Sequence, residues 1–143
     1  MNIRIATAAP AVSTSTDTIL RGLCAALLLG VAQIHFLDVF DKFKENVAQG
    51  WMFAALIAGC LIATLALVHR SGTLVWLLAG LCGLAPLAGY IVSRSVGLAG
   101  AADDIGNWTE PLGLISISTE ASLMLLSAYA VVLGLKSAET TRG

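Results

Sequence analysis

Four long apolar windows constrain this chain more than any other feature. They cover residues 22–40, 50–68, 73–92 and 112–135, and each is long enough to cross a bilayer core, which takes roughly 20 helical residues. Inside lipid, only helices and closed barrels satisfy the hydrogen bonds of the backbone, and these windows lack the alternation of a barrel strand. The sequence therefore predicts an all-α integral membrane protein, a four-helix antiparallel bundle.

Composition leaves little chain for any other domain, because 57% of the 143 residues are hydrophobic and only 12% are charged. We expect a mobile, Ala/Ser/Thr-rich tail over residues 1–17, a transmembrane domain over 18–136 and a short tail over 137–143. Asp17 is the expected N-cap of the first helix. The lipid bilayer is the first partner, and a net charge of -1 argues against nucleic acid.

Basic residues indicate the orientation in the membrane. One side of the predicted bundle carries five of them and the other side three, which favours both termini in the cytoplasm. The first group is Arg4, Arg21, Arg70, Lys136 and Arg142, and the second is Lys42, Lys44 and Arg94.

Small residues recur at every fourth position in three of the windows, which predicts close helix contacts. These contacts could form within the chain or between subunits. The residues are Gly22, Ala26 and Gly30 in the first window, Ala55, Gly59 and Ala63 in the second, and Ala79 and Gly83 in the third.

Glu120 lies near the middle of the fourth window, where charge is costly. On membrane insertion scales, a charged residue at such a position costs about 2.5–3.5 kcal/mol. At about 100° per residue, Glu120 shares one stripe of its helix with Gly113, Ser116, Met124 and Ser127. This small and polar stripe predicts that the carboxylate faces the bundle interior or a partner.

Two interpretations of Glu120 stay open. In the first, it fixes helix packing by pairing with Arg94 or by hydrogen-bonding His35, and a protonated carboxyl group is also compatible. In the second, Glu120, His35 and Asp38 form a site for an ion or a small molecule. His35 and Asp38 are three residues apart on one helix and can face the same ligand.

The cofactor of such a site is unassigned. Nitrogen and oxygen ligands from His35, Asp38 and Glu120 would suit zinc, iron, manganese or copper(II), whereas the scattered cysteines are typical of packing residues. A bis-histidine haem is disfavoured, because His35 and His69 lie near opposite membrane surfaces in the prediction.

The connection before the last window is acidic and rich in glycine. Pro111 fits the first turn of the following helix, and Thr109 is a reasonable N-cap. The candidate residues of this loop are Asp103, Asp104, Trp108 and Glu110. The acids favour a solvated, helix-capping loop over a cation-binding one.

The segment "RSVGL.G..DDIGNWTEPLGL.S...E", from Arg94 to Glu120, resembles a pattern in a group of small four-span bacterial membrane proteins of uncharacterised function. That group also places a histidine near the end of its first helix. The resemblance implies a bacterial inner-membrane location and a four-helix topology. It marks for testing Arg94, Gly97, Gly106, Trp108, Glu110, Pro111, Gly113, Glu120 and His35.

Function is less constrained than fold. The sequence holds no Ser-His-Asp set, P-loop, Rossmann fingerprint or HExxH motif, so an enzyme is disfavoured. The first hypothesis is a non-catalytic accessory or assembly subunit of a larger membrane complex. The alternative is a membrane protein that binds a small molecule, metal or proton through Glu120, His35 and Asp38, as a transport or redox helper. Transport would require a homo-oligomer, because one four-helix chain has little room for an alternating-access cavity.

Overall fold

The computed structural model describes the backbone of residues 14–69, 72–98 and 102–142, and the same residues' side chains apart from Thr14, Asp103 and 135–142. These parts of the chain form four α-helices and one short 3-10 helix, which confirms the predicted all-α bundle. In chain order the elements are α1 (Thr14–Glu45), α2 (Val47–His69), α3 (Thr73–Ser95), η1 (Ala102–Asp104) and α4 (Pro111–Arg142).

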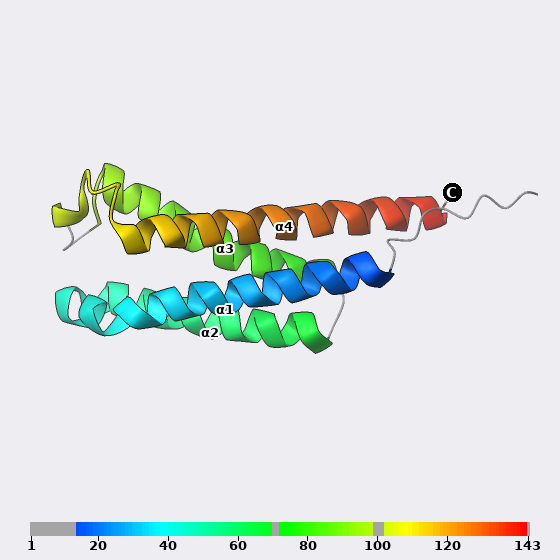
Figure 1. The fold of residues 1–143 in the computed structure, drawn as a ribbon, viewed down its shortest axis with the longest axis horizontal. Helices are drawn as coiled ribbons and strands as arrows, with labels where there is room; N and C mark the ends of the chain where they lie inside the picture. The colour runs from blue at the N-terminus through cyan, green and yellow to red at the C-terminus, as the bar shows by residue number, and fades with distance from the viewer. Residues whose placement is uncertain (1–13, 70–71, 99–101, 143) are drawn as a thin grey trace, which may run out of the picture.

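The four helices lie side by side with alternating direction (Figure 1). α1 packs mainly on α2 and α3 on α4, so the bundle consists of two helical hairpins, which meet chiefly through α1 and α4. The α1–α2 junction and the α3–α4 connection lie at one end, called the loop end below (Figure 1). The start of α1 and the end of α4 lie at the opposite, terminal end.

The outward faces of the helices carry large apolar side chains, such as the exposed Leu29, Ile62, Leu81 and Leu125. Each helix includes a stretch long and apolar enough to cross a membrane, and the chain is a multi-pass membrane protein. α1 has 32 residues, or about 48 Å at 1.5 Å per residue, which exceeds the hydrocarbon core of about 30 Å. Its charged last turns therefore extend beyond the lipid tails.

The helices are longer than the apolar windows. α1 begins at Thr14, so residues 14–17 of the expected tail are helical, while residues 1–13 lie outside the described part of the chain. Asp17 is not the N-cap: it lies in the first turn and accepts a hydrogen bond from Arg21 at 2.6 Å. α4 continues to Arg142, although a tail was expected from residue 137. At the start of α1, the pairing of Asp17 with Arg21 one turn later supports helix beyond the hydrophobic stretch.

The junction between α1 and α2 is also shorter than the gap between the apolar windows 22–40 and 50–68, because Asn46 alone separates the two helices. Lys42 pairs with Glu45 at 2.6 Å and Lys44 with Asp41 at 2.7 Å, which supports the charged last turns of α1. The side-chain oxygen of Asn46 then accepts the N–H of Ala48 at 2.9 Å and helps α2 to begin.

The small residues of α3 form the close contact that their spacing predicts. A Cβ atom on Gly83 would lie 2.6 Å from the carbonyl oxygen of Glu120 and 3.0 Å from the N atom of Met124, so α3 and α4 touch here through their backbones. Gly22 and Ala26 differ, since both are exposed on α1, and a Cβ atom on Gly22 would meet no atom within 4 Å in the described chain.

Replacing Gly83 by alanine is expected to lower the free energy of unfolding by about 1–3 kcal/mol, because the added methyl group would push α3 away from α4. Gly89→Ala is the matched control on the same helix: its Cβ would meet no atom within 4 Å, and its effect should be small or stabilising. Thermal unfolding in mild detergent measures both. Equal melting temperatures would contradict the close α3–α4 contact.

Candidate functional site

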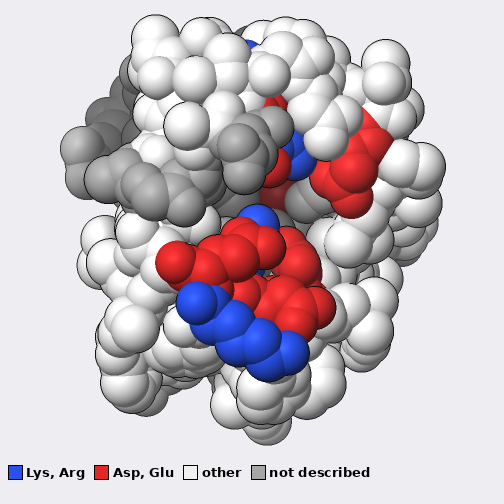
Figure 2. All heavy atoms as spheres, turned by 90° about the vertical axis from the view of Figure 1, so that its left-hand side faces the viewer, with Lys and Arg blue, Asp and Glu red and all other residues white. Residues whose placement is uncertain are grey.

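A cavity of about 380 Å³ lies between all four helices at the loop end. Charged side chains gather around a hollow at the centre of this end (Figure 2). The polar lining residues are His35, Asp38, Lys42, Gln49, Tyr90, Ser93, Arg94, Asp104, Asn107, Glu110, Ser116 and Glu120. Lys42 lies seven positions after His35 on α1, so the cavity extends about 10 Å along the helix axis.

Glu120 lies among the deepest of the lining residues and is only 1% exposed, which confirms that it faces the interior. Its Oε1 atom accepts a hydrogen bond from the Ser116 hydroxyl at 2.5 Å, one turn earlier on the same helix. Its Oε2 atom is buried and has no hydrogen-bond partner among the residues that the structure describes. Half of this carboxyl group is therefore available to a further donor.

His35 faces Glu120 from α1. The Nε2 atom of the ring lies 3.8 Å from Oε1 of Glu120, too far for a hydrogen bond but within ion-pair range. The Nδ1 atom lies 2.9 Å from the carbonyl oxygen of Val31, and since a carbonyl can only accept, Nδ1 carries the proton. In neutral His35, Nε2 is then an acceptor. Phe53 of α2 packs against the ring at 4.8 Å between centroids.

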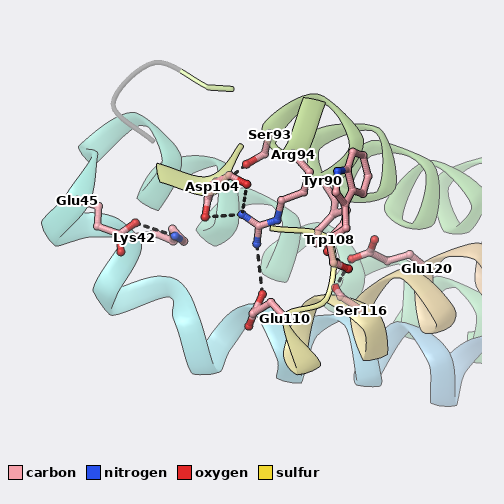
Figure 3. A network of polar contacts seen from close by, with 10 residues as sticks. All are labelled: Lys42, Glu45, Tyr90, Ser93, Arg94, Asp104, Trp108, Glu110, Ser116 and Glu120. Carbon is pink, nitrogen blue, oxygen red and sulfur yellow. Dashed lines mark hydrogen bonds and ion pairs between the residues drawn. The ribbon is translucent and has the colours of Figure 1, made fainter. Parts of the chain in front are cut away.

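Arg94 does not pair with Glu120, contrary to the first interpretation above. It is buried at the end of α3, where it forms an ion pair with Asp104 and a second with Glu110 at 3.2 Å (Figure 3). Its guanidinium carbon also lies 4.9 Å from the centre of the Tyr90 ring. The arginine side chain is long enough for its guanidinium group to reach the loop, where two carboxylates form ion pairs with it.

The α3–α4 connection folds back over the end of α3. Gly97 and Gly106 adopt φ values of 83° and 81°, a region that disfavours residues with a side chain. The N–H of Gly106 donates to the carbonyl oxygen of Arg94 at 2.9 Å, and Ser93 hydrogen-bonds Asp104 at 3.1 Å. These bonds make the loop part of the cavity wall.

The loop candidates take different roles. Asp104 and Glu110 hold Arg94, whereas Trp108 is 43% exposed and packs on Tyr90 at 6.1 Å, outside the lining of the cavity. The side chain of Asp103 lies outside those described. α4 begins at Pro111 as predicted, but Glu110 rather than Thr109 takes the capping position, because its carbonyl accepts the first helical bond from Leu114 at 3.0 Å.

Asp38 lines the same cavity as His35 and Glu120. The three do not form a metal centre, however, since no three His, Cys, Asp or Glu side chains within the described residues lie close enough to hold an ion. His69 is exposed at the end of α2, at the opposite end of the bundle from His35. Tyr90, Lys42 and Gln49 line the cavity without having been predicted to do so.

No family model, curated protein or solved structure matches this chain. The resemblance to small four-span bacterial proteins, carried by the segment from Arg94 to Glu120, stays a prediction. Function is inferred from the geometry and charge of the cavity.

Proposed function

We propose that this multi-pass membrane protein binds a small molecule in the cavity at the loop end. The observation that carries the proposal is the Oε2 atom of Glu120, which is buried near the closed end of a cavity of about 380 Å³ and has no partner in the described part of the chain. Cavities of about 300–1,000 Å³ with a few convergent polar groups are typical ligand sites. A charged group inside a membrane protein is by default a candidate functional group.

The contacts of Glu120 favour ligand binding over a packing role. A carboxylate that fixes two helices together is expected to hydrogen-bond across their interface. The one short bond of Glu120 instead joins it to Ser116 on its own helix, and His35 on α1 stays 3.8 Å away. Glu120 therefore contributes little to holding α1 and α4 together.

The same proposal includes an orientation. Five of the eight Lys and Arg residues lie on the terminal side of the predicted topology, which supports cytoplasmic termini and a cavity that opens on the opposite side of a bacterial inner membrane. Of these five, only Arg21 has a described side chain; those of Arg4, Arg70, Lys136 and Arg142 lie outside the described set.

The accessory-subunit hypothesis is the second candidate. It is favoured by Gly22 and Ala26, which are exposed on α1 at the spacing used in close helix contacts. Both small residues would permit a helix of a second subunit to approach closely. This surface lies outside the cavity, so a partner there and a ligand in the cavity are compatible.

Native mass spectrometry of the protein extracted from its own membrane in mild detergent tests the proposal. We expect a stoichiometric small-molecule adduct on the wild-type protein and its loss in Gly89→Phe, because Gly89 lines the cavity and has open space beside it for a larger side chain. Gly134→Phe is the matched control, since Gly134 also has open space but lies on α4 away from the cavity.

Each outcome separates the two candidates. An adduct that persists in Gly89→Phe, or no adduct in the wild type, contradicts binding in the cavity. A larger protein bound in equal proportion to the wild type and to Gly89→Phe would instead support the accessory role.

A further inference from the structure

We propose that the ligand is a primary ammonium ion with an apolar body, and that its charged group binds Glu120 and His35 near the closed end of the cavity. This inference rests on the proposed function and names the chemical class of the ligand. It follows from the hydrogen-bonding capacity left unused there, from the balance of charge along the lining and from the apolar walls.

Two acceptors near the closed end lack a donor. Oε2 of Glu120 has no partner within the described chain, and Nε2 of neutral His35 is an acceptor because Nδ1 donates to Val31. Both belong to buried residues that line the same cavity. One group that donates several hydrogen bonds would satisfy both acceptors, and an ammonium group carries three N–H donors.

The charges of the residues that line the cavity favour a cationic ligand. Four carboxylate residues, Asp38, Asp104, Glu110 and Glu120, line the cavity with only two cationic residues, Lys42 and Arg94. Both cations are already paired. Arg94 binds Asp104 and Glu110, and Lys42 binds Glu45 outside the cavity (Figure 3). The Nε atom of Arg94 has no partner among the described residues, but two carboxylates already offset its charge. An anionic ligand would therefore meet no unpaired cation in the described lining, and it would face unneutralised acids.

The apolar side chains that line the cavity favour a ligand with an apolar part. Met52, Phe53 and Leu56 of α2 and Pro86 of α3 line the same cavity as Glu120 and His35, and Phe53 packs on the His35 ring. A polar ligand without an apolar part would leave these side chains without contact. An aromatic or alkyl body beside the ammonium group would pack against them.

Other cations fit less well. A transition metal lacks a third His, Cys, Asp or Glu ligand in the described residues. A quaternary ammonium ion has no N–H group to give to Glu120 or His35. A neutral hydroxyl group can donate only one hydrogen bond and leaves the charge of the carboxylate unbalanced.

Three probes of one shape test the inference: 2-phenylethylammonium, the neutral 2-phenylethanol and the quaternary trimethyl(2-phenylethyl)ammonium. Each is titrated calorimetrically into the full chain in nanodiscs of zwitterionic lipid, and the signal from nanodiscs without protein is subtracted. The proteins are the wild type, Glu120→Gln, Gly89→Phe and the control Gly134→Phe.

We expect the wild type and Gly134→Phe to bind the primary ammonium about tenfold or more tightly than either other probe, since hydrogen bonds to a charged group are the stronger ones. Glu120→Gln keeps the size of the side chain and removes its charge. It is expected to lose about tenfold in affinity for the primary ammonium and to bind 2-phenylethanol as the wild type does.

Failure of this inference is distinct from failure of the proposed function. If 2-phenylethanol binds the wild type as tightly as the ammonium, and Gly89→Phe abolishes both, the cavity binds ligands but does not select a primary ammonium. If the quaternary probe binds the wild type as tightly as the primary ammonium does, hydrogen bonding to Oε2 of Glu120 and Nε2 of His35 does not select the ligand. If no probe distinguishes the wild type from Gly89→Phe, both the inference and binding in the cavity are contradicted.

Discussion

Replacing Arg94 by methionine is expected to release the α3–α4 connection from the end of α3 and to lower the free energy of unfolding by about 3 kcal/mol. Methionine keeps an unbranched side chain of similar length but leaves Asp104 and Glu110 without their shared cation. The lower end of the range for buried pairs applies, because the side chains of Asp104 and Glu110 are 28% and 38% exposed and water compensates part of the loss.

Hydrogen exchange locates the effect. The amides of Gly106 and Asn107, which hydrogen-bond Arg94 and Asp104, are expected to exchange about a hundredfold faster in Arg94→Met, as 3 kcal/mol of local destabilisation implies. In Arg94→Lys these amides should exchange at rates between those of the wild type and Arg94→Met, since lysine keeps the charge but cannot bind both carboxylates through a planar fork.

Lys44→Met is the matched control for Arg94→Met. Lys44 also pairs with an acid, Asp41 at 2.7 Å, but the two side chains are 76% and 64% exposed, so the change should have little effect on stability. If Arg94→Met leaves the exchange of Gly106 and Asn107 unchanged, Arg94 does not hold the loop. Equal losses of stability in Arg94→Met and Lys44→Met would mean that the burial of Arg94 does not strengthen its ion pairs.

Hydropathy was sufficient to predict the helices but not their ends. The apolar windows predict four spans because lipid imposes helix on every long apolar segment. Outside lipid, helix continues wherever local pairing supports it: Asp17 with Arg21 at the start of α1, and Lys42 with Glu45 at its end. Such i,i+3 and i,i+4 pairs contribute only a few tenths of a kcal/mol each, so the helix ends were misplaced by several residues.

Individual residues of the site could be predicted from the sequence, but the pairs that they form could not. Glu120 and His35 stand out in the sequence because polar groups in apolar windows are costly. The partners of Arg94 could not be obtained by counting residues along helices, since they depend on a loop that turns back at Gly97 and Gly106. Tyr90 was not among the candidate residues, and only the tertiary arrangement shows its place on the cavity wall and beneath Arg94.

Replacing Glu120 by leucine is expected to stabilise the protein by about 1–3 kcal/mol and to abolish binding of the ammonium probe. Leucine is apolar and of similar volume, and exchanging a buried polar or charged group for such a residue is often stabilising when that group's interactions are incomplete. Those of Glu120 are incomplete, because among the described residues one of its oxygens has no partner and it makes no hydrogen bond to another helix. A residue that lowers stability in this way persists where function requires it.

Thermal unfolding of Glu120→Leu and Glu120→Gln in the same detergent tests this trade-off, beside calorimetric titration of 2-phenylethylammonium. Higher stability with binding lost in the leucine variant is the expected result. A melting temperature several degrees below that of the wild type would instead make Glu120 a packing residue, as in the first interpretation of its sequence. Glu120→Gln separates size from charge: it keeps a hydrogen-bonding group beside Ser116, so a packing role predicts near wild-type stability for glutamine and a loss for leucine alone.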